Sequence, residues 1–326
     1  MTATAGPAGR LLLLDSASLY FRAFFGVPDS VRAPDGTPVN AVRGLVEMIA
    51  RLVADRHPTR LVACWDEDWR PAFRVEAVPS YKAHRVAREV PGTTGEEEVP
   101  AALTAQIPVI VEVLAALGIP RLGAPGYEAD DVIGTLVARE AARPAGERAA
   151  VDVVTGDRDL FQLVDDDVPV RVLYPVKGVK EMLEVDQGVL RERYGVPTGR
   201  AYADMAVLRG DPSDGLPGVP GIGEKTAAAM LSRYGTLEGV LAARDAGDKG
   251  LTATQRARLT AAADYLAVAP RVVTVAPDAP VAQVDDHLPR VPADPDALVA
   301  LAERWGLTSS VRRIVDVLTD AGDARG

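Results

Sequence analysis

The first half of the chain alternates short apolar runs with amphipathic stretches. Four apolar runs have the length of buried strands and lie at residues 10–14, 61–65, 119–122 and 151–154. Between these runs, apolar side chains recur every three or four residues, as on one face of a helix, at residues 41–56, 107–117 and 132–137. This alternation predicts an α/β fold with a central, largely parallel sheet flanked by helices.

Beyond residue 186 the alternation ends and the sequence becomes mostly helical. Helical periodicity marks residues 201–209, 251–266, 294–305 and 309–318, with one extended segment expected near 272–275. We therefore expect an α/β part over residues 1–185 and a helical part over residues 186–326.

Composition indicates a soluble globular protein, with 48% hydrophobic and 25% charged residues in 326. The longest apolar run is far below the ~18–20 residues of a membrane span, and Leu11–Leu14 is too short for a signal-peptide core. A cytoplasmic protein is expected. Cys64 is the single cysteine and is predicted to be a buried strand residue, and the three histidines argue against a zinc site of Cys and His ligands.

Carboxylates follow the predicted strands. Asp15 and Asp66 each follow one run, and Asp157 and Asp159 follow another. Because the carboxyl ends of parallel strands meet at one edge of a sheet, where ligands bind, we expect these acids to face one site.

A denser acidic stretch, Gly126–Gly134, holds Glu128, Asp130 and Asp131 at the start of a predicted helix. A helix N-terminus favours a nearby anion by about 0.3–1 kcal/mol, which does not offset the repulsion of three clustered carboxylates. A hard divalent cation such as Mg²⁺ or Mn²⁺ would offset this repulsion. Taken alone, the stretch is explained equally well as an acidic helix cap.

Two further segments have the composition of nucleic-acid contacts. Residues 69–88 interleave cations with aromatic side chains, which suits phosphates and unstacked bases, although a solvated charged face is the alternative. Residues 88–98 have no periodicity and are expected to form a mobile loop or lid.

A glycine- and proline-rich hairpin at residues 210–223 opens onto a helix that begins with Lys225 and Thr226. It departs from both the P-loop and the dinucleotide-binding patterns. Its exposed backbone N–H groups would suit a phosphate, as in a sequence-independent clamp on DNA.

Six sequence blocks, in order, resemble the 5′-nuclease family, which includes the amino-terminal 5′→3′ exonuclease domain of bacterial DNA polymerase I and the flap endonucleases. The blocks are Leu-Leu-Asp15, Trp-Asp66, Phe73-Arg74…Tyr81-Lys82…Arg85, Gly-Tyr-Glu128-Ala-Asp130-Asp131, Thr-Gly-Asp157-Arg-Asp159 and Gly-Asp211-Pro-Ser-Asp214…Pro-Gly-Ile-Gly-Glu-Lys-Thr. The resemblance implies a 5′-nuclease (PIN-like) fold, with an arch at about 70–104 and a helix-hairpin-helix (H3TH) DNA-binding subdomain at about 204–235.

The family pattern also implies a set of site residues. The acids around the metals would be Asp15, Asp66, Glu128, Asp130, Asp131, Asp157, Asp159, Asp211 and Asp214. The catalytic residues would be Lys82, Arg85, Asp130 and Asp157. The nucleic-acid contacts would be Phe21, Arg70, Arg74, Tyr81, Lys82, Arg85, Gly218, Gly221, Gly223, Lys225 and Thr226. With those nine acids set aside as metal ligands, the net charge of −10 falls to −1, so acidity does not argue against a DNA partner.

The function implied is that of a structure-specific 5′→3′ exonuclease and 5′-flap endonuclease that uses two Mg²⁺ or Mn²⁺ ions and leaves 5′-phosphates, in primer removal and DNA repair. Its substrates would be flapped, nicked or branched DNA and RNA primer–DNA hybrids, with K⁺ in the hairpin turn. A stand-alone, monomeric, nucleoid-associated enzyme is expected, because 326 residues leave no room for the polymerase. A non-catalytic binder of branched DNA and a ribonuclease of the same acidic α/β class are the alternatives.

The sequence departs from the family pattern at two positions. Ser16 follows the first acid where a glycine is common, and Gly215 replaces the asparagine usual after the second acid of the Asp-x-x-Asp pair.

Overall fold

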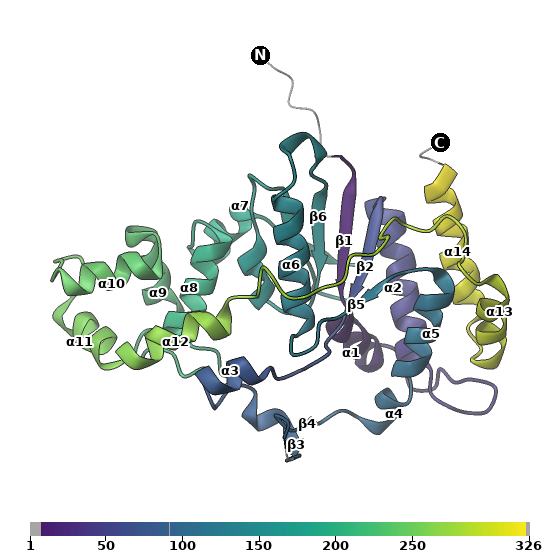
Figure 1. Cartoon of the computed structure of the whole chain (residues 1–326), viewed down its shortest axis with the longest axis horizontal. Helices are drawn as coiled ribbons and strands as arrows, with labels where there is room; N and C mark the ends of the chain where they lie inside the picture. Colours follow the sequence, from purple (N-terminus) through teal and green to yellow (C-terminus); the bar gives the residue numbers. More distant parts are fainter. Residues whose placement is uncertain (1–7, 91, 324–326) are drawn as a thin grey trace.

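The structure, a computed structural model, describes residues 8–90 and 92–323. Its centre is a six-stranded sheet in the order β5-β2-β1-β6-β7-β8 (Figure 1). The strands are β1 (Arg10–Asp15), β2 (Arg60–Cys64), β5 (Arg121–Leu122), β6 (Ala150–Val154), β7 (Val170–Pro175) and β8 (Met182–Val185). All neighbours pair in parallel except β7 and β8, which are antiparallel. The predicted fold class is confirmed.

The apolar run of β1 is continuous because the strand is buried on both faces. Leu11 and Leu13 belong to one core, and Leu12 and Leu14 belong to the other. The first core lies against α6 (Ala129–Ala141) and the helical part; the second lies against α1 (Ser16–Gly26), α2 (Asn40–Arg56) and α5 (Ile107–Leu117). The buried Cys64 packs in the first core, as expected.

Two strands at the sheet edge, β7 and β8, were not predicted. Each carries charged side chains, such as Arg171 and Glu184, within a short run. The pattern there lacks the uninterrupted apolar stretch that marks the central strands. Their hairpin forms the far edge of the sheet.

The helical part consists of α7 (Gln187–Val189), the π-helical turn η4 (Leu190–Tyr194), α8 (Gly199–Arg209), α9 (Glu224–Tyr234), α10 (Leu237–Asp245), α11 (Ala253–Ala261) and α12 (Ala263–Val273). The single helix expected over 251–266 is in fact two helices that meet at Ala262. The extended segment expected near 272–275 begins later, because α12 continues past Pro270 to Val273. Helices α8 and α9 pack together across the glycine-rich hairpin.

The C-terminal segment returns to the sheet. The backbone N–H of Ala276 donates to Asp131, and the N–H of Leu61 on β2 donates to the carbonyl of Asp286. Helices α13 (Pro295–Arg304) and α14 (Thr308–Asp323) then pack on α5 and α2 (Figure 1). The prediction that grouped these two helices with the helical part needs correction, since their apolar faces complete the second core.

The segment predicted as an arch consists of α3 (Ala72–Ala77), the 3₁₀ turn η1 (Ala83–Arg85), a two-stranded hairpin of β3 (Val86–Arg88) and β4 (Glu96–Glu97), and α4 (Ala101–Thr104). Two more 3₁₀ turns, η2 (Ala145–Glu147) and η3 (Asp159–Leu163), flank β6. Among the described residues, no helix is both long and apolar enough to cross a membrane.

Candidate active site

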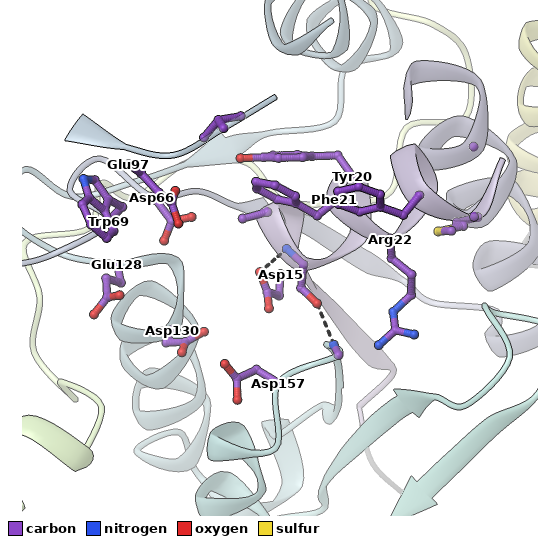
Figure 2. Close-up of a pocket in the computed structure, with 18 of the residues that line it drawn as sticks. Asp15, Tyr20, Phe21, Arg22, Asp66, Trp69, Glu97, Glu128, Asp130 and Asp157 are labelled. Atoms are coloured by element: carbon purple, nitrogen blue, oxygen red, sulfur yellow. Dashed lines mark hydrogen bonds between the residues drawn. The ribbon is translucent and has the colours of Figure 1, made fainter. Parts of the chain in front are cut away.

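A cleft of about 1580 Å³ opens at the carboxyl ends of β1, β2 and β6. Five of the predicted acids, from four separate segments, line it: Asp15, Asp66, Glu128, Asp130 and Asp157 (Figure 2). The structure therefore brings together the acids that the sequence places at strand ends and at the start of α6.

Local hydrogen bonds orient two of these acids. Asp15 ends β1 and caps α1: its Oδ1 accepts from the backbone N–H of Ser18 at 3.1 Å, and its Oδ2 accepts from Thr155 Oγ1 at 2.6 Å. The Oδ1 of Asp66 accepts from the N–H of Ala129, at the first turn of α6, at 2.8 Å. Each carboxylate is thus held by the helix that follows or faces its strand.

Burial raises the pKa of Asp15 to about 6 and that of Asp66 to about 7, and neighbouring carboxylates add to both effects. Burial and the charges of Asp15 and Asp157 also raise the pKa of Asp130 well above its usual range. Crowded, buried carboxylates of this kind are costly to ionise unless a cation accompanies them. A donor set made of carboxylate oxygens fits hard divalent ions.

A second acidic group adjoins Asp157. Asp159, Asp211 and Asp214 do not line the cleft, but they lie close enough to influence one another. Burial raises the pKa of Asp159 well above its usual range, helped by the charges of Asp157, Asp214 and Asp211. All four residues are among the nine acids predicted to surround the metal ions.

The carboxylates of the cleft are not drawn tightly together. Among the described residues, one group of three possible ligand atoms lies within 4.8 Å of one another: Asp285, Asp286 and His287. This group is largely exposed and outside the cleft, and Asp286 already receives two hydrogen bonds from Arg60. We attach no function to it.

Asp131 does not face the cleft, which corrects its prediction as a metal ligand. Its side chain is fully buried and accepts two hydrogen bonds from Arg74, both at 2.7 Å. It also accepts from the N–H groups of Glu128 and Ala276. With its oxygens so engaged, Asp131 joins α6 to α3 and to the returning C-terminal segment.

Three of the predicted nucleic-acid contacts are buried instead. Arg70 donates to the carbonyl oxygens of Tyr81, Thr94 and Pro79, which holds the base of the arch together. Arg74 pairs with Asp131 and Glu128, and the Tyr81 hydroxyl donates to Glu128 at 2.7 Å. Arg70, Arg74 and Tyr81 are therefore buried side chains that support the arch base and Glu128. The sequence pattern could not distinguish such a buried set from an exposed basic face.

Lys82 and Arg85 do line the cleft. The Lys82 ammonium donates to Glu128 Oε1, and Arg85 donates to the carbonyl of Ser213 at 2.8 Å and to Asp214 Oδ1 at 3.1 Å. Burial alone would lower the pKa of Lys82, but the charge of Glu128 raises it well above the usual range. Lys82 is therefore a cation beside the acids.

The base of the arch is docked on the turn that carries Asp211 and Asp214. The N–H of Lys82 donates to the carbonyl of Asp214 at 3.0 Å, and Ser80 Oγ donates to the carbonyl of Gly215 at 2.7 Å. Gly215 has φ of +72°, and a Cβ there would lie 2.1 Å from the Ser80 carbonyl oxygen. This close approach explains why glycine replaces the usual asparagine.

Phe21 lies on the cleft wall beside Tyr20, with ring centroids 5.4 Å apart. This position fits the prediction that Phe21 contacts nucleic acid, since an aromatic ring on a cleft wall can stack on an unstacked base. Side chains that the sequence analysis did not single out also line the cleft: Arg22, Glu97, Lys177 and Lys180. The scarcity of lysine was a usable signal, because three of the five lysines, Lys82, Lys177 and Lys180, line the cleft.

The hairpin residues divide into two groups. Gly218 is buried, and a Cβ on it would lie 2.4 Å from the backbone nitrogen of Gly210, so its role is internal packing rather than contact with DNA. Gly221 lies against Arg258, which donates to its carbonyl at 2.9 Å.

By contrast, a Cβ on Gly223 would meet nothing within 4 Å. Gly223 caps α9, which places Lys225 in the exposed first turn of that helix and leaves Thr226 half-buried. This end of the hairpin is open to a phosphate.

The chain belongs to the 5′-3′ exonuclease family. The family model described as the 5′-3′ exonuclease N-terminal resolvase-like domain matches residues 10–195, and the one described as the 5′-3′ exonuclease C-terminal SAM fold matches residues 197–296. A 5′-3′ exonuclease of Streptomyces coelicolor is 63% identical over 308 residues, which cover 94% of this chain and 100% of that relative. A 5′-3′ exonuclease of Mycobacterium tuberculosis is 52% identical over 315 residues, covering 94% and 97%.

DNA polymerase I of Mycobacterium bovis is 40% identical over 96% of this chain, but the match spans 32% of that polymerase. Solved structures share the fold. A flap endonuclease of bacteriophage T5 in complex with DNA and metal ions has a TM-score of 0.62 at 19% identity and covers 95% of this chain and 99% of its own. Human GEN1 in complex with Holliday junction DNA has a TM-score of 0.58 at 15% identity, and the match covers 97% of this chain and 73% of the GEN1 chain.

Proposed function

We propose that this exonuclease-family chain hydrolyses DNA phosphodiesters at 5′ ends and 5′ flaps with two divalent ions. The observation that carries the proposal is the convergence of five of the predicted acids, from four segments, on one cleft that Lys82 and Arg85 also line. Two metals, Mg²⁺ or Mn²⁺, would supply hydroxide near neutral pH and stabilise the leaving 3′ oxygen.

The residues divide between the two ions. Asp15, Asp66, Glu128 and Asp130 would hold one ion, and Asp157, Asp159, Asp211 and Asp214 would hold the other. Lys82 and Arg85 would donate hydrogen bonds to the scissile phosphate, an electrostatic effect of a few kcal/mol, about 3 for one such donor. Phe21 would stack on a base, and the open end of the hairpin would grip duplex phosphates.

The proposal extends to substrate and cellular context. Flapped, nicked or branched DNA and RNA primer–DNA hybrids would be cut to leave 5′-phosphates, as needed in primer removal and repair. On such substrates the chain would act as a monomer at the nucleoid, in the cytoplasm. K⁺ in the turn of the hairpin would help to bind phosphate, and replacing K⁺ by Na⁺ should then weaken duplex binding.

The decisive experiment is cleavage of a 5′-flap DNA duplex, with an RNA hairpin as the competing substrate. Cleavage of the flap in Mg²⁺, none in EDTA, and 5′-phosphate products are expected. Preferred cutting of the RNA hairpin would favour a ribonuclease, and metal-independent binding without cutting would favour a non-catalytic binder.

A matched pair of variants tests the site itself. Lys82→Ala should lower the single-turnover rate by about a hundredfold or more, since oxyanion-type donors have effects of this size. Lys249→Ala removes an exposed lysine from the loop between α10 and α11 and should cut at the wild-type rate.

A further inference from the structure

A basic end of the cleft is not explained by the hydrolytic machinery. Arg22, Lys177 and Lys180 line this end, together with the apolar side chains of Phe25 and Val179. In Figure 2, Arg22 lies on the other side of Asp15 from Glu128, the residue that holds Lys82. The acids are therefore flanked by cations on two sides.

Arg22 is poised for an anion from outside the chain. It is half-buried, and among the described residues neither a hydrogen bond nor an ion pair engages its guanidinium. The guanidinium lies against Gly156, where a Cβ would come within 2.4 Å of Nη2. A larger residue at position 156 would displace Arg22, so the backbone beside Asp157 leaves room for it.

The two lysines lie on the loop of the β7–β8 hairpin. Lys177 is 79% exposed and has a long, 3.5 Å pairing with Glu181, and Lys180 is also exposed. Surface pairs of this kind are weak, on the order of 0–1 kcal/mol, so Glu181 would not prevent Lys177 from meeting a phosphate.

The aromatic side chain beside these cations is unusually open. Phe25 is 72% exposed, and its ring lies 6.5 Å from that of Phe21 at an interplanar angle of 22°. Two nearly parallel rings on one helix offer successive stacking faces. Cations together with exposed aromatic faces suit a single strand, whose unstacked bases duplex DNA cannot present.

We infer that this basic end, defined by Arg22, Phe25, Lys177 and Lys180, binds a single-stranded segment of the nucleic-acid substrate. Phosphates would lie at the three cations and an unstacked base on Phe25. The inference rests on the proposed function, because it assigns this single strand to the same substrate whose scissile phosphate lies at the acids.

The test measures binding rather than cutting, by fluorescence anisotropy in EDTA, on a 5′-flap duplex and on the flush duplex that lacks the flap. The Lys177→Glu/Lys180→Glu double variant should bind the flap duplex at least about tenfold more weakly. The slope of log K against log salt should fall by about 1.4, at about 0.7 for each single-strand phosphate contact. Phe25→Ala should weaken flap binding without changing that slope.

Binding of the flush duplex should stay within about twofold of wild type in both variants. The control is Arg290→Glu/Arg312→Glu, which makes the same charge change at two exposed positions outside the cleft and should leave flap binding unchanged. An equal loss on both substrates would make this a duplex contact and overturn the inference, as would an unchanged affinity for the flap.

These outcomes are separable from the fate of the proposed function. A wild-type protein that binds the flap but fails to cut it in Mg²⁺ would refute the hydrolytic proposal and leave the basic end as a binding site. A wild-type protein that cuts, with lysine variants that bind normally, would refute the inference alone.

Discussion

Glu128 is the residue at which the arch, the sheet edge and the helical part meet. Its carboxylate accepts hydrogen bonds from Arg74, Tyr81 and Lys82. Arg74 in turn donates to the carbonyl of Val272 on α12 at 2.9 Å. The side chains that hold Glu128 thus connect three parts of the chain, and a metal at Glu128 would compete with the Lys82 ammonium.

Arg74→Met should be strongly destabilising. It leaves the buried carboxylate of Asp131 without its bidentate partner, and unpaired buried charges of this kind cost about 3–5 kcal/mol. Urea denaturation measures the change. The control is Arg271→Met, which removes an exposed guanidinium that lies 5.8 Å from the Phe73 ring and should cost below about 1 kcal/mol. Equal effects of the two substitutions would show that the buried pairing contributes little.

The raised pKa values of Asp15, about 6, and Asp66, about 7, predict how pH acts on the metal-free protein. Because both lie above the usual carboxyl value of 3.8, the folded state binds more protons than the unfolded state. Their contribution to stability is complete below about pH 4 and is lost as pH rises through 6 and 7.

Mg²⁺ requires the ionised carboxylates, so its stabilising effect should grow between about pH 5.5 and 8. Melting temperatures measured across this range, in EDTA and in Mg²⁺, give the difference directly. Asp66→Asn should flatten the pH dependence of the metal-free protein. A Mg²⁺-induced shift that is constant with pH would contradict the assignment of these groups to the metal site.

Two adjacent acids, Asp130 and Asp131, show how much of the site the sequence alone can predict. Asp130 and Asp131 are adjacent, yet one lines the cleft and the other is buried against Arg74. Successive helix residues point about 100° apart, so the two side chains point in different directions. Which one does depends on Arg74, which is 57 positions away in the chain and brought there by tertiary packing.

At the scale of elements, the sequence predicted the strands whose two faces are both buried. The central strands β1, β2 and β6 are continuous apolar runs, and α5 and α8 end at Gly118 and Gly210, directly after the predicted helical stretches 107–117 and 201–209. The edge hairpin β7–β8 and the small hairpin in the arch were missed, since strands with one exposed side give a weak pattern over few residues. The sequence also did not predict which arch side chains are buried, because the same letter stands for a buried arginine and an exposed one.

Docking of the arch on the Asp211–Leu216 turn depends on one glycine. Gly215→Ala would place a Cβ 2.1 Å from the Ser80 carbonyl oxygen, in addition to the strain of a positive φ. The arch base should shift, moving Lys82 and Arg85 away from the acids and lowering the single-turnover rate by about a hundredfold, as small misplacements do. Binding to flush duplex should change little.

Gly36→Ala is the matched control, because Gly36 has φ of +91° and open space around its Cβ position. Both variants bear the backbone strain of a left-handed residue, about 1–2 kcal/mol, so a shared loss of stability is expected. A loss of rate specific to Gly215→Ala would isolate the docking contact. If both variants cut normally, the arch base does not need this turn.

At the scale of the whole molecule, the sheet and the helical part share one continuous hydrophobic core. The first core runs without interruption from β1 and β6 through Phe161 and Tyr202 to α9 and α12. The rings of Phe161 and Tyr202 lie 5.4 Å apart at this junction. The second core is closed by α14, at the other end of the chain. The sequence predicted two successive parts, but packing joins them through both cores.

This continuity predicts a single unfolding transition. Leu231 on α9 belongs to the first core, and Ile314 on α14 belongs to the second; both side chains are fully buried. Leu231→Ala and Ile314→Ala should each lower the free energy of unfolding by about 2–5 kcal/mol, the usual cost of such cavities. Urea transitions followed by far-UV circular dichroism report the helices, whereas tryptophan fluorescence reports Trp65, Trp69 and Trp305, which all lie outside α7–α12. In each variant the two signals should shift together. If the helical part folded independently, Leu231→Ala would lower the urea midpoint of the dichroism transition and leave that of the tryptophan fluorescence unchanged. The junction at Phe161 and Tyr202 would then be a docking surface between two separate folding units rather than a shared core.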